Sequence, residues 1–213
     1  MPLRILLRTV SLLLMGLFCL SAAADPLGIG GPYGEYSMAY QGPETLTLLV
    51  IPDGSGDGFG SASLPDGGTE DATITLTLLD AGYNPIYQFP REDMWLQSRD
   101  NGMVPCNGGT IADANTDVNG ITHWTNPVLA GGYSETLTEA LVNGSHLELT
   151  VGVKLSFNSP DINGDLVVNL VDIQLFTQDF FSGYDFRSDY YRDGTLNLAD
   201  ISLMAQAVGA ACP

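Results

Sequence analysis

Basic side chains are scarce in this 213-residue chain, where seven Lys and Arg stand against 25 Asp and Glu. Two of the seven, Arg4 and Arg8, lie in the first 24 residues, which hold no acidic residue. The remaining 189 residues therefore carry five basic side chains and a net charge of −20. Binding to a nucleic-acid backbone requires clustered Lys and Arg. The composition argues against a nucleic-acid partner and suits solubility and cation binding.

Residues that carry catalysis are also sparse. His123 and His146 are the only histidines, and neither has a partner at metal-ligand spacing. The sequence contains no nucleophile elbow, phosphate-binding loop or zinc motif. With 25 acidic residues, pairs of carboxylates arise by chance and do not identify a glycosidase. We therefore expect no enzymatic activity.

The first 24 residues predict an export signal. Arg4 and Arg8 precede an apolar run from Val10 to Leu20, and three alanines end at Ala24. The apolar run is too short for a convincing membrane span. We expect cleavage near Ala24, a secreted, extracellular bacterial protein, and no membrane span in the mature chain.

Only two cysteines, Cys106 and Cys212, remain after this leader. An even pair in an exported protein favours a disulfide. The bond would close a loop of roughly 100 residues and tie the end of the chain to its N-terminal part. The alternatives are two separate thiols or bonds to other chains.

Short strand patterns dominate up to about residue 158. Period-two alternation and β-rich runs are separated by Gly, Pro and Asn, as in a β-sandwich. The clearest alternation spans 73–78, and no helical periodicity precedes residue 170. Pro160 marks the boundary to a second module. Further strands are expected at 46–50, 94–98, 121–125, 134–142 and 147–157.

The stretches 72–80, 84–86, 116–120 and 130–132 carry a strand, a turn with Pro, and a Thr-Asp-x-x-Gly turn. Together they resemble bacterial immunoglobulin-like domains of the invasin type. The resemblance implies an immunoglobulin-like β-sandwich over 70–158 that serves as a spacer or adhesion module. Residues 25–69 are expected to add a strand and a Gly-rich loop region to it.

Two copies of one twelve-residue acidic loop start 28 residues apart, at Asp161 and Asp189. Calcium takes roughly six to eight hard oxygen ligands, which such loops supply from positions 1, 3, 5, 9 and 12 and from a carbonyl at position 7. Each loop runs into a helical apolar pattern. We therefore predict two calcium sites, loop one (161–172) and a weaker loop two (189–200). Their ligands are Asp161, Asn163, Asp165, Val167, Asn169 and Asp172 in loop one, and Asp189, Asp193, Thr195, Asn197 and Asp200 in loop two.

The duplicated loop, with one helix after each copy and Pro160 in place of a leading helix, resembles a dockerin over residues 160–209. The resemblance implies a small all-α domain over 159–213. Its expected partner is a cohesin-like or cell-surface protein, and a polysaccharide is a further possible partner. Three features depart from the pattern. Leu166 replaces the usual Gly at position 6, and Tyr191 offers no carboxylate or carboxamide at position 3. Positions 10 and 11, which help a dockerin choose its cohesin, are apolar in both copies.

The sequence allows other interpretations of the acidic loops, the aromatic residues and the C-terminal domain. The acidic loops could be metal-free helix caps, because Asp and Asn favour N-caps. Trp95, Trp124 and Tyr133 could form a sugar-stacking face, although such aromatics more often belong to a core. The calcium domain could act only as an intramolecular staple. The acidic stretch 113–120 lacks a closing carboxylate and is more consistent with a turn.

We therefore expect a secreted, non-catalytic modular protein that binds calcium through the dockerin-like loops, for extracellular assembly or attachment. The first alternative is a carbohydrate-binding or polysaccharide-degrading accessory protein, and the second is the intramolecular staple.

Overall fold

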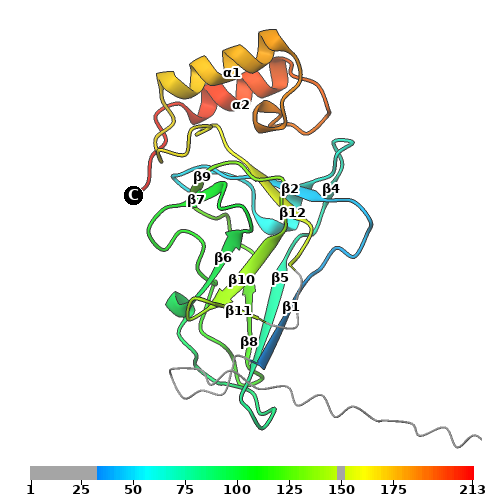
Figure 1. The fold of residues 1–213 in the computed structure, drawn as a ribbon, viewed down its shortest axis with the longest axis vertical. Coiled ribbons are helices and arrows are strands. Elements are labelled where there is room, and N and C mark those ends of the chain that lie inside the picture. The colour runs from blue at the N-terminus through cyan, green and yellow to red at the C-terminus, as the bar shows by residue number, and fades with distance from the viewer. Residues whose placement is uncertain (1–32, 148–151) are drawn as a thin grey trace, which may run out of the picture.

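The computed structural model describes residues 33–147 and 152–213. The export signal expected at 1–24 lies outside these residues. All twelve strands of the described chain end by residue 158, and both α-helices of the described part follow Asn169 (Figure 1). A mainly β part followed by a small helical part is therefore confirmed.

Residues 33–158, here called the β-rich module, form four sheets among the described residues. The strand orders are β1-β5-β8, β11-β10-β6, β12-β2-β3-β4 and β7-β9. All pairs are antiparallel except β12 with β2, where Leu155 lies opposite Leu46 in a parallel register. The strands are β1 (Tyr33–Met38), β2 (Leu46–Leu49), β3 (Ala62–Ser63), β4 (Thr69–Glu70), β5 (Ile74–Leu79), β6 (Met94–Ser98), β7 (Met103–Pro105), β8 (Ile121–Trp124), β9 (Ala130–Gly132), β10 (Thr138–Val142), β11 (Ser145–His146) and β12 (Leu155–Asn158).

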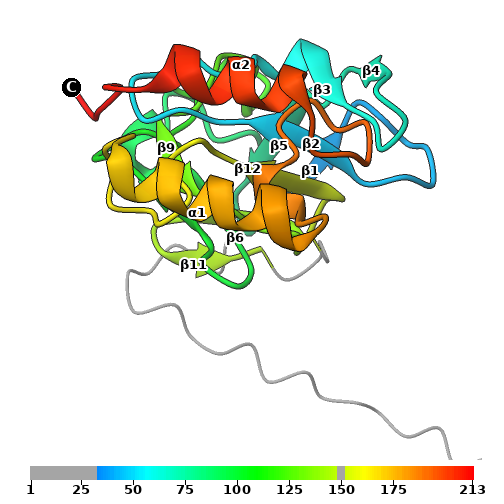
Figure 2. The ribbon, with the colours of Figure 1, turned by 90° about the horizontal axis from the view of Figure 1, so that it is seen from above.

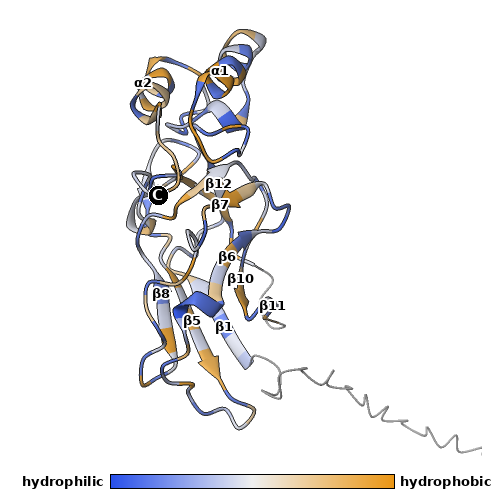
Figure 3. Ribbon diagram, turned by 90° about the vertical axis from the view of Figure 1, so that its left-hand side faces the viewer, coloured by the Kyte–Doolittle hydropathy of each residue, from blue (hydrophilic) through white to orange (hydrophobic). Residues whose placement is uncertain are grey.

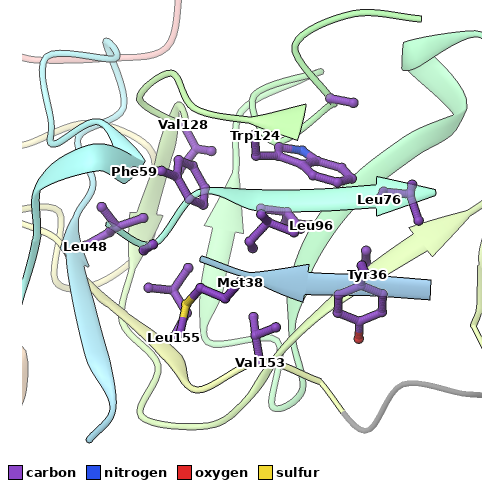
Figure 4. Packing of buried hydrophobic residues seen from close by; sticks show 14 of the residues in the cluster. Tyr36, Met38, Leu48, Phe59, Leu76, Leu96, Trp124, Val128, Val153 and Leu155 are labelled. Carbon is purple, nitrogen blue, oxygen red and sulfur yellow. The ribbon is translucent and has the colours of Figure 1, made fainter. Parts of the chain in front are cut away.

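All four sheets contribute to one hydrophobic core (Figure 4). In β5, Ile74, Leu76 and Leu78 are buried while the residues between them are half-buried, because successive side chains of a strand point to opposite faces. The strand predicted at 73–78 is therefore confirmed. Residues 33–69 belong to the same core, to which they add Tyr36, Leu48 and Phe59 among others.

The aromatic residues considered for sugar stacking have different places in the fold. Trp124 is 1% exposed and belongs to the core, and its indole N–H donates to the carbonyl of Thr110 at 2.9 Å. Trp95 is half-buried on β6. Tyr133 is 36% exposed and lies under the guanidinium of Arg187. Trp124 is thus a packing residue and contributes no exposed ring.

Strand β2 is buried along its whole length because it contacts two cores. Leu46 and Leu48 face the main core. Leu49, together with Ile51 just beyond the strand, packs with Phe176 and Met204 of the helices in a second cluster. The helical module, residues 159–213, is therefore packed onto one end of the β-rich module, as Figure 1 shows.

The helical module consists of α1 (Leu170–Ser182) and α2 (Leu198–Ala207), joined through the 3-10 turn η3 (Phe186–Ser188). The two α-helices run side by side in opposite directions (Figure 2). Asn169 and Asn197 cap them, and each forms a capping box with an Asp three residues later. Such caps satisfy amide groups that the first helical turn leaves free. No helix in the described part of the chain has the length and apolar character needed to cross a membrane.

The expected disulfide is confirmed: Cys106 and Cys212 are bonded, with their Cα atoms 5.7 Å apart. The tail before Cys212 also pairs with loop one. The amide of Gly209 donates to the carbonyl of Val168 and the amide of Val168 donates to that of Ala210, both at 2.9 Å. The end of the chain is therefore tied to loop one by hydrogen bonds and to the β-rich module by a covalent bond.

An ion pair between α1 and η3 was not foreseen from the sequence. Arg187 donates two hydrogen bonds of 2.8 Å to the carboxylate of Asp179, and the Ser188 hydroxyl donates a third of 2.7 Å. Asp179 is only 5% exposed. Burial acts to raise the pKa of Asp179, but these hydrogen bonds outweigh it and hold the pKa below its ordinary value.

Replacing Arg187 by Met is expected to lower the free energy of unfolding by about 3 kcal/mol, because it leaves the buried Asp179 carboxylate without its cation. Urea denaturation at neutral pH measures this loss. The matched control is Arg91→Met, since Arg91 pairs with Glu92 at the surface and exposed pairs contribute about 1 kcal/mol or less. Equal losses in the two variants would contradict the expectation.

Candidate metal centre

Three carboxylates of loop one converge on one point. Asp161, Asp165 and Asp172 each offer an oxygen, and these oxygens all lie within 4.8 Å of one another. Asp161 and Asp172 are fully buried, while Asp165 is exposed at the rim. Among the described residues this is the one such group of acidic, His or Cys side chains. The structure thus brings positions 1, 5 and 12 of the loop together.

The backbone of loop one places these carboxylates. Asp161 lies three residues after the end of β12, and its Oδ2 accepts a hydrogen bond from the Leu166 amide at 2.8 Å. Asp172 lies in the first turn of α1, where it accepts from the amides of Asn163 at 3.1 Å and Asn169 at 2.9 Å. Asp161 therefore orders the loop, and Asp172 connects the loop to the start of α1.

The remaining predicted ligands of loop one lie beside these carboxylates. Asn163 Oδ1 accepts from the Asp165 amide at 2.9 Å, and its Nδ2 donates to Asp165 Oδ2 at 3.0 Å. Asn169 Nδ2 donates to the carbonyl of Val167 at 3.0 Å, while its Oδ1 accepts from Val171 as the helix cap. All six predicted residues of loop one thus belong to one hydrogen-bonded cluster.

The three ionised carboxylates of loop one destabilise the folded loop when no cation is bound. Burial raises the pKa of Asp161, the Leu166 amide opposes the shift, and the charges of Asp172 and Asp165 add to it, so that the pKa reaches about 6. A buried carboxylate near other negative charges resists ionisation. A bound cation would offset this cost by neutralising the three charges.

Both loops use left-handed backbone at positions 4 and 6. In loop one these are Gly164 and Leu166, with φ of 69° and 70°. In loop two they are Arg192 and Gly194, with φ of 59° and 78°. Each loop therefore has one glycine and one residue for which this conformation is unfavourable. Leu166 departs from the usual glycine, yet the backbone follows the same course as in loop two.

Loop two arranges its acids differently. Asp189 and Asp200 are fully buried, but the acids of this loop do not form a converging group of the kind found in loop one within the described chain. Asp189 Oδ2 accepts from the Gly194 amide at 3.0 Å and from the Tyr184 hydroxyl at 3.1 Å. Its Oδ1 has no hydrogen-bond partner among the described residues.

The other predicted ligands of loop two are bonded to one another. Asp193 accepts from Thr195 through Oδ1, at 3.0 Å from its amide and 2.7 Å from its hydroxyl, and from Asn197 through Oδ2 at 2.9 Å. Asp200 accepts from the amides of Tyr191 and Asn197. Burial raises the pKa of Asp200 against these two hydrogen bonds, and Asp189 and Asp193 add to the rise.

The contacts of two residues near loop two, Arg192 and Tyr184, were not predicted from the sequence. Arg192 is at position 4, and its side chain is 12% exposed with Nη1 3.9 Å from Asp189 Oδ2. The guanidinium lies over the ring of Phe186, 4.6 Å from its centre. Tyr184 precedes the loop and reaches back to Asp189. Tyr191, at position 3, is 54% exposed and adds no ligand. Only the positive charge of Arg192 inside an acidic loop hinted at these contacts.

The third acidic stretch forms turns. Asp113 Oδ2 accepts from both the amide and the hydroxyl of Thr125, and Asp117 Oδ1 accepts from the amides of Asn119 and Ile121. The Asp117 bonds reach two and four residues ahead, as in an Asx turn, whereas Asp113 is bonded to a residue twelve positions away. A turn is therefore confirmed at 117–120, within the stretch 113–120 where one was expected.

A groove of about 510 Å³ lies between α1 and α2. Its lining is Ile173, Phe176, Thr177, Phe180 and Phe181 from α1, and Ile201, Met204, Ala205 and Val208 from the α2 side. No charged side chain lines it, although the chain is strongly acidic. Leu170, Phe181 and Leu198 are each more than three-quarters exposed, and Figure 3 shows hydrophobic residues on both helices. The module thus presents an uncharged apolar surface.

The donor set of loop one fits calcium. It consists of hard oxygens from carboxylates, carboxamides and one carbonyl, which calcium prefers over nitrogen and sulfur ligands. In loop two, the buried and unpartnered Asp189 Oδ1 is also suited to a cation.

The chain matches no protein-family model, and no curated protein or solved structure is significantly similar to it.

Proposed function

We propose that this chain is a secreted, non-catalytic modular protein that binds calcium through its dockerin-like loops and uses the helical module for extracellular assembly or attachment. The observation that carries the proposal is the convergence of Asp161, Asp165 and Asp172 within 4.8 Å. As part of the same proposal, the β-rich module is an immunoglobulin-like sandwich that acts as a spacer.

Loop one is the stronger calcium site in this proposal, and loop two is the weaker one. Three carboxylates, two carboxamides and the Val167 carbonyl are available in loop one. Loop two lacks a ligand at position 3, and the Tyr184 hydroxyl and Arg192 compete for Asp189. Fewer oxygen ligands and less negative charge weaken calcium binding.

The groove between α1 and α2 supports attachment to a protein partner with an apolar, uncharged ridge. Its lining carries no charge, and burial of apolar area is the main favourable term in association. A second copy of the chain is a poorer partner, because two molecules that each carry a net charge of −20 repel one another.

An intramolecular staple is the second candidate function, and specific contacts favour it. Leu49 and Ile51 of the β-rich module pack into the helical cluster, and the Cys106–Cys212 bond ties the chain end across the same boundary. Calcium would then order the helices chiefly to hold the two modules together.

Calcium titration calorimetry on the mature chain tests the proposal. Asp165→Asn is expected to weaken the tighter site about tenfold or more, since it removes one ligand charge. Asp165 is exposed, so its replacement leaves no buried charge unpaired. Asp193→Asn changes the matched position of loop two and is expected to affect only the weaker site. Retention of the chain by cohesin-like modules is expected only for variants that bind calcium.

Asp66→Asn provides the control. Asp66 lies outside both loops and accepts a hydrogen bond from Gly68 that Asn can also accept. Absence of calcium binding in the wild-type chain would refute the proposal, and so would an equal affinity in Asp165→Asn and Asp66→Asn.

A further inference from the structure

Loop one lies directly against the β-rich module at Gly131 of β9. A methyl group added at Gly131 would lie 1.8 Å from Asp161 Oδ2, 2.6 Å from its Cγ and 3.1 Å from its Cβ. The next amide, of Gly132, donates to the carbonyl of Asp161 at 2.7 Å. Both the main chain and the carboxylate of Asp161 are therefore placed against β9.

A second contact holds the turn of loop one against the same two-stranded sheet. A methyl group at Gly164 would lie 2.9 Å from Val104 Cγ2 and 3.7 Å from the Cα of Gly132. Val104 of β7 is paired with Gly131 of β9 in an antiparallel register. The β7-β9 sheet therefore packs against positions 1 and 4 of loop one.

We infer that β9 is part of the calcium site and that Gly131 is a positioning residue for Asp161. The inference rests on the proposed calcium function. Asp161 is held from one side by the amides of Asp165 and Leu166, which donate to its carboxylate at 3.2 and 2.8 Å. From the other side its carboxylate contacts the bare backbone of Gly131. Any side chain at residue 131 displaces the carboxylate from the point where it meets Asp165 and Asp172.

Glycine is required at residue 131 for space and not for backbone conformation. The φ of Gly131 lies outside the left-handed region, which other glycines of this chain occupy. Alanine therefore suits the backbone there, and the three atoms nearest to the added methyl group all belong to Asp161. This makes Gly131→Ala a selective probe, because it lies in the β-rich module and changes no ligand.

The inference also means that the helical module does not contain the whole site. The backbone of β9 comes from a strand about 30 residues before loop one. A bound cation would then stabilise the contact between the two modules as well as the loop itself.

Calcium titration of the full mature chain, with its disulfide intact, tests this inference. Gly131→Ala is expected to weaken the tighter site at least tenfold and to leave the weaker site unchanged. Gly60→Ala is the matched control, because a methyl group there meets nothing within 4 Å. The near-ultraviolet circular dichroism spectrum, to which the buried Trp124 contributes, should be the same in both variants if the core is intact.

Hydrogen exchange on the unmutated chain gives a second test that does not depend on the variant folding. Calcium is expected to slow exchange of the Gly132 amide at least tenfold, since that amide donates to Asp161. The Leu78 amide, which donates to Gly120 at the far side of the core, should not change.

Wild-type affinity in Gly131→Ala, together with weakened binding in Asp165→Asn, would overturn the role of β9 and leave the proposed function standing. Calcium protection confined to residues 161–172, with none at Gly132, would overturn it in the same way. A wild-type chain that binds no calcium would overturn both.

Discussion

Replacing both Cys106 and Cys212 by Ser is expected to lower the free energy of unfolding by about 4–5 kcal/mol. The bonded residues are 106 positions apart. In the chain-entropy model, a cross-link that closes a loop of about 100 residues restricts the unfolded chain by roughly this amount. Urea denaturation of the oxidised chain and of the double variant measures the difference.

The single variant Cys106→Ser is the control, because it loses the same bond and should lose about the same stability. Locally, the amides of Gly209 and Val168 should exchange faster in the double variant, since the tail that pairs with loop one is no longer anchored. Equal stability of the oxidised chain and the double variant would contradict a stabilising role for the bond.

Calcium is expected to raise the free energy of unfolding by about 4 kcal/mol at pH 7.5, when its free concentration is a thousand times the dissociation constant of loop one. The ligand binds the folded loop, where Asp161, Asp165 and Asp172 converge, and the unfolded chain has no such arrangement. Thermal denaturation in calcium and in a chelator measures the gain, and a tenfold weaker site in Asp165→Asn is expected to reduce it to about 2.7 kcal/mol.

Without calcium, stability is expected to fall as the pH rises from about 4 to 6. The folded pKa of Asp161 is raised from 3.8 to about 6, so the native state binds more protons than the unfolded state across this window. The loss from Asp161 alone is about 3 kcal/mol. Burial also raises the pKa of Asp57, as it does for Asp200, and both act in the same direction.

With calcium the trend should reverse, because the metal binds the ionised carboxylate and protons compete with it below pH 6. The calcium-induced rise in melting temperature should therefore be small at pH 5 and large at pH 7.5. A rise of equal size at both values would show that Asp161 is not a ligand that titrates in this range.

Features that depend on neighbours within one loop or strand were predictable from the sequence. The six residues of loop one cluster as expected because their hydrogen bonds span only two to nine positions. The strand at β5 follows from its alternation. The disulfide was expected from an even number of cysteines, a composition argument that needs no geometry.

Features that depend on distant segments were decided by the tertiary structure. Asp161 and Asp189 hold the same position in two loops with the same spacing of acidic residues, yet one lies against the backbone of Gly131 and the other meets Tyr184 and Arg192. The sequence of a loop does not by itself determine which strand packs against it. The paired acidic loops were thus determined locally by residue spacing. The difference between the two loops, and the burial of β2 on both faces, arise because folding packs the helical module onto the β-rich module.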